Sequence, residues 1–146
     1  MNKTNRIDKM RYQLNKSAYW LVLLSMVFQT ISLFMTITPR SVIPTMSTAV
    51  EILINILLLL VTFLAAEKVK AYSNRYVYGL FGISAVHLFR VFNEPLKLLK
   101  LKQISSVQYT QITILIGLTI LFMVYAALIT LRKYHELKTH LKEIGE

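Results

Sequence analysis

Four long apolar blocks constrain the fold of this chain more than any other feature. They cover residues 18–38, 46–66, 76–92 and 112–131. Three of them, the first, second and fourth, match the length of about 20 residues at which a helix crosses a hydrocarbon layer of ~30 Å. Hydrophobic residues make up 55% of the chain, above the roughly 45–50% of soluble domains. The sequence therefore predicts an all-α membrane protein with one integral membrane domain over residues 1–146.

The third block is the shortest and contains a charge, Arg90, close to its end. Tyr76 and Tyr78 stand where interfacial aromatic anchors are expected, and residues 93–95, Asn-Glu-Pro, form a helix stop signal. These features favour four transmembrane helices. The alternative is three spans, with the third block lying on the cytoplasmic face.

The distribution of Lys and Arg predicts the orientation. The net charge is +10, and the basic residues flank the apolar blocks instead of forming one stripe, which argues against nucleic-acid binding. With four spans, most of the 17 Lys and Arg residues lie on the side of the termini. By the positive-inside rule, the N-terminus and C-terminus are cytoplasmic, in a multi-pass protein of the cytoplasmic (cell) membrane. The basic groups would contact anionic lipid head groups. An arrangement with three spans divides the Lys and Arg residues between the two sides in the same numbers, so this rule does not separate the two arrangements.

Polar residues inside two of the blocks form a candidate intramembrane polar site. If residues 46–92 form a hairpin that turns near Ala71, Glu51 and Arg90 lie at nearly equal distances along the chain from the turn. Asn55 and His87 are likewise equally far from it. An antiparallel hairpin would therefore place Glu51 beside Arg90 and Asn55 beside His87.

This polar site has three interpretations. Glu51 and Arg90 can form an ion pair, with Asn55 and His87 hydrogen-bonded, that fixes helix packing. Alternatively, the four side chains line a chamber in which Glu51 and His87 carry protons or bind a cation, and Arg90 holds an anion. The third interpretation places Glu51 and Arg90 high enough in the membrane to be hydrated.

Two periodic stripes predict helix contacts. Ser25, Gln29, Ser32 and Thr36 recur at helical spacing along the first block, which predicts a helix-contact stripe, with a pathway lining as the alternative. Beyond the fourth block, residues 132–146 are predicted to form a cytoplasmic helical extension. Its apolar positions form a partner seam made of Tyr134, Leu137, Leu141 and Ile144, and this spacing suits a coiled coil or packing on a partner.

The sequence contains no signature of an enzyme. It has no cysteine, and no H-E-x-x-H, nucleophile elbow, P-loop or Rossmann glycine pattern. The spacing of His135 and His140 does not match a helical metal pair. No catalytic residue, metal or cofactor is therefore predicted.

These features favour an accessory or assembly subunit of a larger membrane complex. The chain has only 4 glycines and no interrupted span, whereas its stripes suit protein contacts, so we expect a membrane-protein partner or a homo-oligomer. The alternative is a small oligomeric ion- or proton-coupled transporter or channel that uses Glu51, His87 and Arg90. A holin-like or membrane-stress protein is a third possibility.

Overall fold

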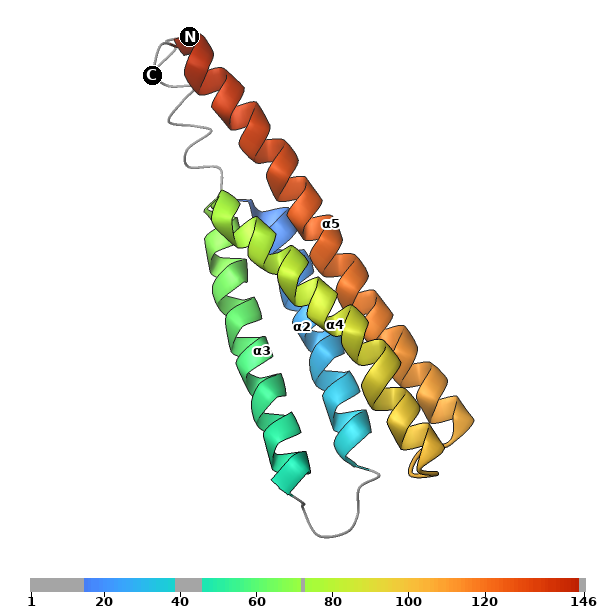
Figure 1. Cartoon of the computed structure of the whole chain (residues 1–146). Helices are drawn as coiled ribbons and strands as arrows, with labels where there is room; N and C mark the ends of the chain where they lie inside the picture. Colours follow the sequence, from blue (N-terminus) through green and yellow to red (C-terminus); the bar gives the residue numbers. More distant parts are fainter. Residues whose placement is uncertain (1–14, 39–45, 72, 145–146) are drawn as a thin grey trace.

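The fold is a bundle of antiparallel helices (Figure 1). The structure, a computed structural model, describes residues 15–38, 46–71 and 73–144. This part of the chain contains four helices and no strands. The helices are α2 (Lys16–Ile37), α3 (Met46–Lys70), α4 (Asn74–Lys100) and α5 (Ser106–Ile144). Each helix runs opposite to the one before it, and the predicted all-α architecture is confirmed.

Three of these helices are long and apolar enough to cross a membrane. They correspond to Lys16–Ile37, Thr48–Lys70 and Ser106–Thr139, and thus to the first, second and fourth apolar blocks. Their length and composition support the predicted membrane protein. Helix α4 is not among the three, because His87, Arg90 and the polar residues that follow lower its hydropathy.

The predicted helix stop at residues 93–95 is wrong. Pro95 lies inside α4, which continues to Lys100. Proline removes one backbone hydrogen bond, but two side-chain contacts support the helix around it. An ion pair between Arg90 and Glu94 bridges the turn before Pro95, and Leu98 is buried in an apolar cluster after it. The other buried members of this cluster are Ile104, Ile112 and Ile116.

Helix α5 is one continuous element of 39 residues. Residues 132–144 continue it without a break, as expected for the helical extension. Near this point Asn15 Nδ2 donates a hydrogen bond of 2.9 Å to Thr130 Oγ1, so Thr130 lies level with the start of α2. The rest of α5 extends about 21 Å beyond that level, and Figure 1 shows this extension.

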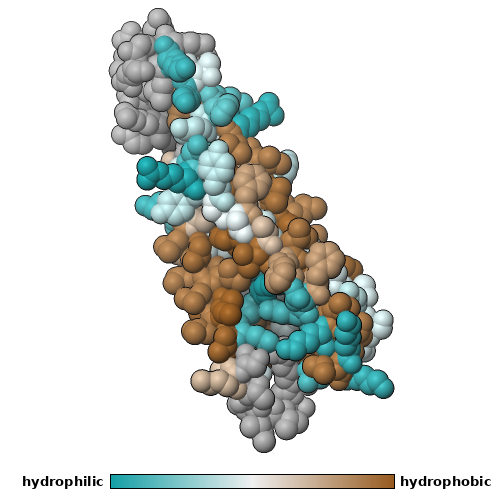
Figure 2. Space-filling view, in the orientation of Figure 1, coloured by the Kyte–Doolittle hydropathy of each residue, from teal (hydrophilic) through white to brown (hydrophobic). Residues whose placement is uncertain are grey.

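The packing of the bundle is inverted relative to a soluble protein. Among the described residues, the interior contains nearly as many polar as apolar side chains, whereas many large apolar side chains are exposed. Figure 2 shows the resulting hydrophobic belt. One apolar cluster consists mainly of small residues from all four helices, with Ala18, Ala65, Ala66, Ala126 and Ala127 among them. Small side chains let helix backbones approach closely, which is how helices associate in lipid.

We expect the close helix contact at Ala126 to tolerate no larger side chain. Ala126→Leu should destabilise the bundle by about 1–3 kcal/mol, because the added methylene groups have no space. Ala85→Leu is the matched control, since Ala85 lies on the exposed side of α4. Thermal unfolding in detergent measures both. Equal melting temperatures for the two variants would contradict the close packing of α5 in this cluster.

Candidate functional site

A hydrogen-bonded clamp at one end of the bundle sets the register of the helices. The backbone N–H of Asn15 donates to the Lys70 carbonyl oxygen at 3.1 Å, and the Asn15 side chain donates to Thr130. These bonds tie the start of α2 to the end of α3 and to α5. Helix α4 begins directly afterwards, at Asn74. This end, which we call the clamp end, is a common origin from which depth along each helix can be counted.

Three buried polar side chains, Gln29, Asn55 and His87, lie at the same depth from the clamp end. The segments that separate them from it are 15–29 along α2, 55–70 along α3 and 73–87 along α4. At a helical rise of ~1.5 Å per residue, each segment covers about 21–22 Å. The exposed fractions of Gln29, Asn55 and His87 are 2%, 3% and 1%. We call these three residues the polar layer.

The polar layer contains buried atoms without hydrogen-bond partners. Asn55 Nδ2 donates to the Glu51 carbonyl oxygen at 2.8 Å. Both amide atoms of Gln29, Oδ1 of Asn55 and Nε2 of His87 have no partner among the described residues. An unsatisfied buried polar group costs about 1–3 kcal/mol. The layer is therefore a place where water, a proton or a small cation could be bound.

The predicted stripe of α2 lies on its buried face. Ser25, Gln29, Ser32 and Thr36 are all buried. Their hydroxyl groups, however, donate to carbonyl oxygens of α2 itself, at 2.7 Å for Ser25, 2.8 Å for Ser32 and 2.7 Å for Thr36. Across the contact with α5, Thr119 Oγ1 lies 3.4 Å from the Ser25 carbonyl oxygen, and its hydroxyl also donates to the Leu115 carbonyl oxygen of its own helix at 2.9 Å.

Sequence reasoning missed several buried polar residues of the other helices. Thr119 and Thr130 of α5, Thr62 of α3 and Ser84 of α4 are buried, and Asn15 was overlooked because it precedes the first block. A single hydroxyl in an apolar block is a weak signal, since it can bond its own backbone on any face. Thr119 and Thr130 are separated by three helical turns, so they share one face of α5 and could have been recognised together.

Arg90 is held by a carboxylate of its own helix. Its Nε and Nη2 atoms donate to the two carboxylate oxygens of Glu94, at 3.1 and 2.6 Å. The side chains are 9% and 23% exposed. The spacing of four places Arg90 and Glu94 on one face of the helix, where such side chains are neighbours. Pairing between Arg90 and Glu51 stays a prediction.

Glu51 lies in a groove at the end opposite the clamp. The groove has a volume of about 650 Å³ and is lined by Glu51 of α3 together with one stretch of α4. We call it the outer groove. Its α4 residues and the residue that follows them are Phe92, Asn93, Glu94, Leu96, Lys97, Lys100 and Leu101. Glu51 therefore shares a groove with Glu94, the partner of Arg90.

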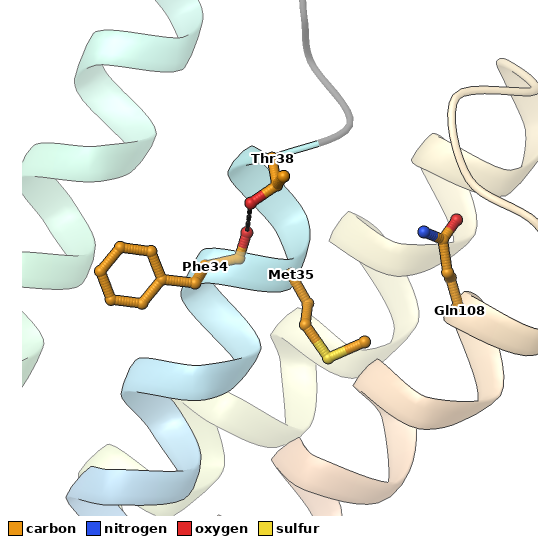
Figure 3. Close-up of a pocket in the computed structure, with 4 residues that line it drawn as sticks. All are labelled: Phe34, Met35, Thr38 and Gln108. Carbon is orange, nitrogen blue, oxygen red and sulfur yellow. Dashed lines mark hydrogen bonds between the residues drawn. The ribbon is translucent and has the colours of Figure 1, made fainter.

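A smaller hollow lies at the same end, between α2 and α5. Its volume is about 300 Å³ and its lining is Phe34, Met35, Thr38 and Gln108 (Figure 3). The Thr38 hydroxyl donates to the Phe34 carbonyl oxygen at 2.7 Å. The described residues that line this hollow include no charged side chain, so unlike the outer groove it offers no charged group to a ligand.

The partner seam is described only in its first half. Tyr134 and Leu137 are half-buried, whereas the side chains of Leu141 and Ile144 lie outside the described part of the chain. In the residues that are described, no group of three His, Asp or Glu side chains could hold a metal ion.

Comparison with protein-family models, with curated proteins and with solved structures finds no match to this chain. The chemistry of the site is therefore inferred from its own residues. The site has three parts: the buried polar layer, the partly buried ion pair further along α4, and the outer groove with charges of both signs.

We expect Arg90 and Glu94 to be energetically coupled. A double-mutant cycle with Arg90→Leu and Glu94→Leu should give a coupling of about 1–3 kcal/mol, because each single change strands a partly buried charge. The control is the exposed pair Arg132 and Glu136, whose side chains are 85% and 54% exposed. Its cycle should give less than about 0.5 kcal/mol. Unfolding in detergent provides the free energies.

Equal coupling in the two cycles would contradict a structural role for the Arg90–Glu94 pair. A third cycle, with Arg90→Leu and Glu51→Leu, tests the pairing predicted from the sequence. Strict additivity there would show that Glu51 and Arg90 do not interact.

Proposed function

We propose that all four helices span the cytoplasmic membrane, with both termini in the cytoplasm. Support comes from the two faces of α4. Ser84, His87 and Arg90 are buried inside the bundle, whereas large apolar side chains are exposed on the outer face. These are Tyr78, Val86, Leu88, Phe89 and Phe92. A helix lying on the membrane surface would expose its polar face to water, so this arrangement favours a spanning helix.

We further propose that the protein is an accessory or assembly subunit of a membrane complex. The observation that carries this proposal is the extension of α5 beyond the clamp end. Among the described helices, α3 ends and α4 begins at the clamp end, so neither continues alongside this part of α5. Tyr134 and Leu137 recur at helical spacing along the extension, and Arg132, His135 and Glu136 are exposed. A cytoplasmic partner packed on Tyr134 and Leu137 would stabilise it.

A small ion- or proton-coupled transporter is the second candidate. The observation that favours it is the polar layer near the middle of the bundle, because several of its buried atoms have no partner in the described part of the chain. Intramembrane polar groups often mark ion or proton pathways. In this candidate His87 carries the proton, and Glu51 in the outer groove provides the exit.

Cysteine labelling tests the number of spans, since the chain has no native cysteine. Gln103 lies between α4 and α5, and we expect Gln103→Cys to react with a membrane-impermeant maleimide added outside intact cells. With three spans, position 103 would instead be cytoplasmic. Thr38→Cys should be labelled from outside in both arrangements, and Ala71→Cys in neither. Protection of position 103 in intact cells would refute four spans.

Charge substitutions in the extension separate the two functions. If the protein is a subunit, Leu137→Lys with Leu141→Lys should abolish copurification of its partner from native membranes, because charges would enter an apolar contact. Membrane insertion should be unchanged. The matched control is His135→Lys with Thr139→Lys, which adds two lysines at the same spacing on the exposed face of α5. It should retain the partner.

Reconstituted protein tests the transporter candidate. The purified chain in vesicles would then carry an ion or proton flux. Glu51→Gln or His87→Ala would abolish this flux, and the Leu137 and Leu141 changes would leave it unchanged. That result would contradict the subunit proposal. Loss of a partner only in the Leu137 and Leu141 variant, without flux by the purified chain, would support the subunit proposal.

A further inference from the structure

The outer groove lies at the depth where membrane hydrocarbon gives way to head groups. Segment 51–70 of α3 separates Glu51 from the clamp end, and segment 73–93 of α4 separates Asn93 from it. As helix, both segments cover about 28–30 Å, which is one hydrocarbon thickness. The clamp end itself carries Lys16, Lys68 and Lys70, as expected at the opposite interface. A groove at this depth faces phospholipid head groups.

The groove contains charges of both signs beside apolar surface. Lys97 and Lys100 are exposed, and Glu51 is half-buried. Glu94 already neutralises Arg90 through two hydrogen bonds. Phe92 at the groove is 67% exposed. Figure 2 shows a hydrophilic patch near the end of the molecule away from the termini, bordered by hydrophobic surface.

Helix α3 leaves a wide apolar face below Glu51. Among the described side chains between Met46 and Val61, Asn55 alone is buried. Close packing of α3 begins further along, at Thr62, Ala65 and Ala66. Ile54 and Val61, which lie on the same side of α3 as Glu51, are 47% and 48% exposed. Acyl chains of a lipid whose head group sits in the groove could pack along this face.

We propose that the outer groove binds a phospholipid with a phosphoethanolamine head group. The ammonium groups of Lys97 and Lys100 bind the phosphate, as charge-assisted hydrogen bonds to phosphate are strong. The Glu51 carboxylate accepts from the ethanolamine ammonium. A carboxylate has about four acceptor sites, so this bond is compatible with the contacts that Glu51 makes within the chain. The acyl chains lie on the face of α3 that carries Ile54 and Val61.

The charges of the groove distinguish this lipid from two others. A phosphocholine head group has a cation but no N–H donor for Glu51. A phosphoglycerol head group has hydroxyl donors but no cation, and its net negative charge would lie against Glu51. Phosphoethanolamine alone among the three provides both an anion for the lysines and a cationic N–H donor for the carboxylate. The inference rests on the proposed four-span arrangement, which cysteine labelling tests independently.

Native mass spectrometry of the purified full-length protein tests the proposal. Phosphatidylethanolamine, phosphatidylcholine and phosphatidylglycerol with identical acyl chains are added in equal amounts. We expect wild type to retain phosphatidylethanolamine about tenfold more tightly than either competitor. Glu51→Gln should remove this preference while other lipids still bind. Lys97→Gln with Lys100→Gln should weaken binding of all three lipids by about tenfold.

The matched control is Lys68→Gln with Arg75→Gln, which removes two exposed charges at the clamp end. This variant should retain the wild-type preference. Equal binding of the three lipids by wild type would overturn the proposal, and this measurement needs no variant. Unchanged selectivity in Glu51→Gln would also overturn it. So would a dimer that dissociates in the lysine variant while lipid selectivity is retained, because the groove would then bind a second copy of the chain.

Discussion

The clamp formed by Asn15 is the contact on which the rest of this structure depends. One residue joins three helices, because its backbone N–H donates to Lys70 and its side chain donates to Thr130. In a membrane, moving an apolar side chain from lipid into a contact between helices gains little free energy, because the lipid tails are equally apolar. Hydrogen bonds and close contacts between small residues must therefore set the register. Around the clamp, alanines of α2, α3 and α5 form the apolar cluster in which the helices meet.

Counted from the clamp, the three residues of the polar layer lie at the same depth. Gln29, Asn55 and His87 come from three helices, and each is buried. Atoms of this layer that have no partner among the described residues cost stability, so they do not explain why the bundle holds together. The small residues near the clamp let the helices approach closely, whereas hydroxyls bonded to their own helix add no bond between helices. The cost at the layer is what makes it a candidate for binding or proton transfer.

The two ends of the bundle differ in their chemistry. The clamp end is tightly packed and carries the extension of α5. At the opposite end, α4 continues past Pro95 because the Arg90–Glu94 pair and Leu98 stabilise it on both sides. This continuation places Lys97 and Lys100 beside Glu51 and creates the outer groove. A helix that ended at residue 93 would have no such groove.

The sequence by itself determined the number and approximate positions of the helices, since composition along the chain is a local property, but not the end of α4 beyond Pro95. The apolar blocks predicted the number of helices and the turn near Ala71, and the spacing of Tyr134 and Leu137 indicated that α5 would continue. Tertiary structure decided which polar groups meet. The bond between Asn15 and Thr130 joins residues 115 positions apart. It does not follow from periodicity, because periodicity gives the face of a helix but not the contacts that this face makes with other helices.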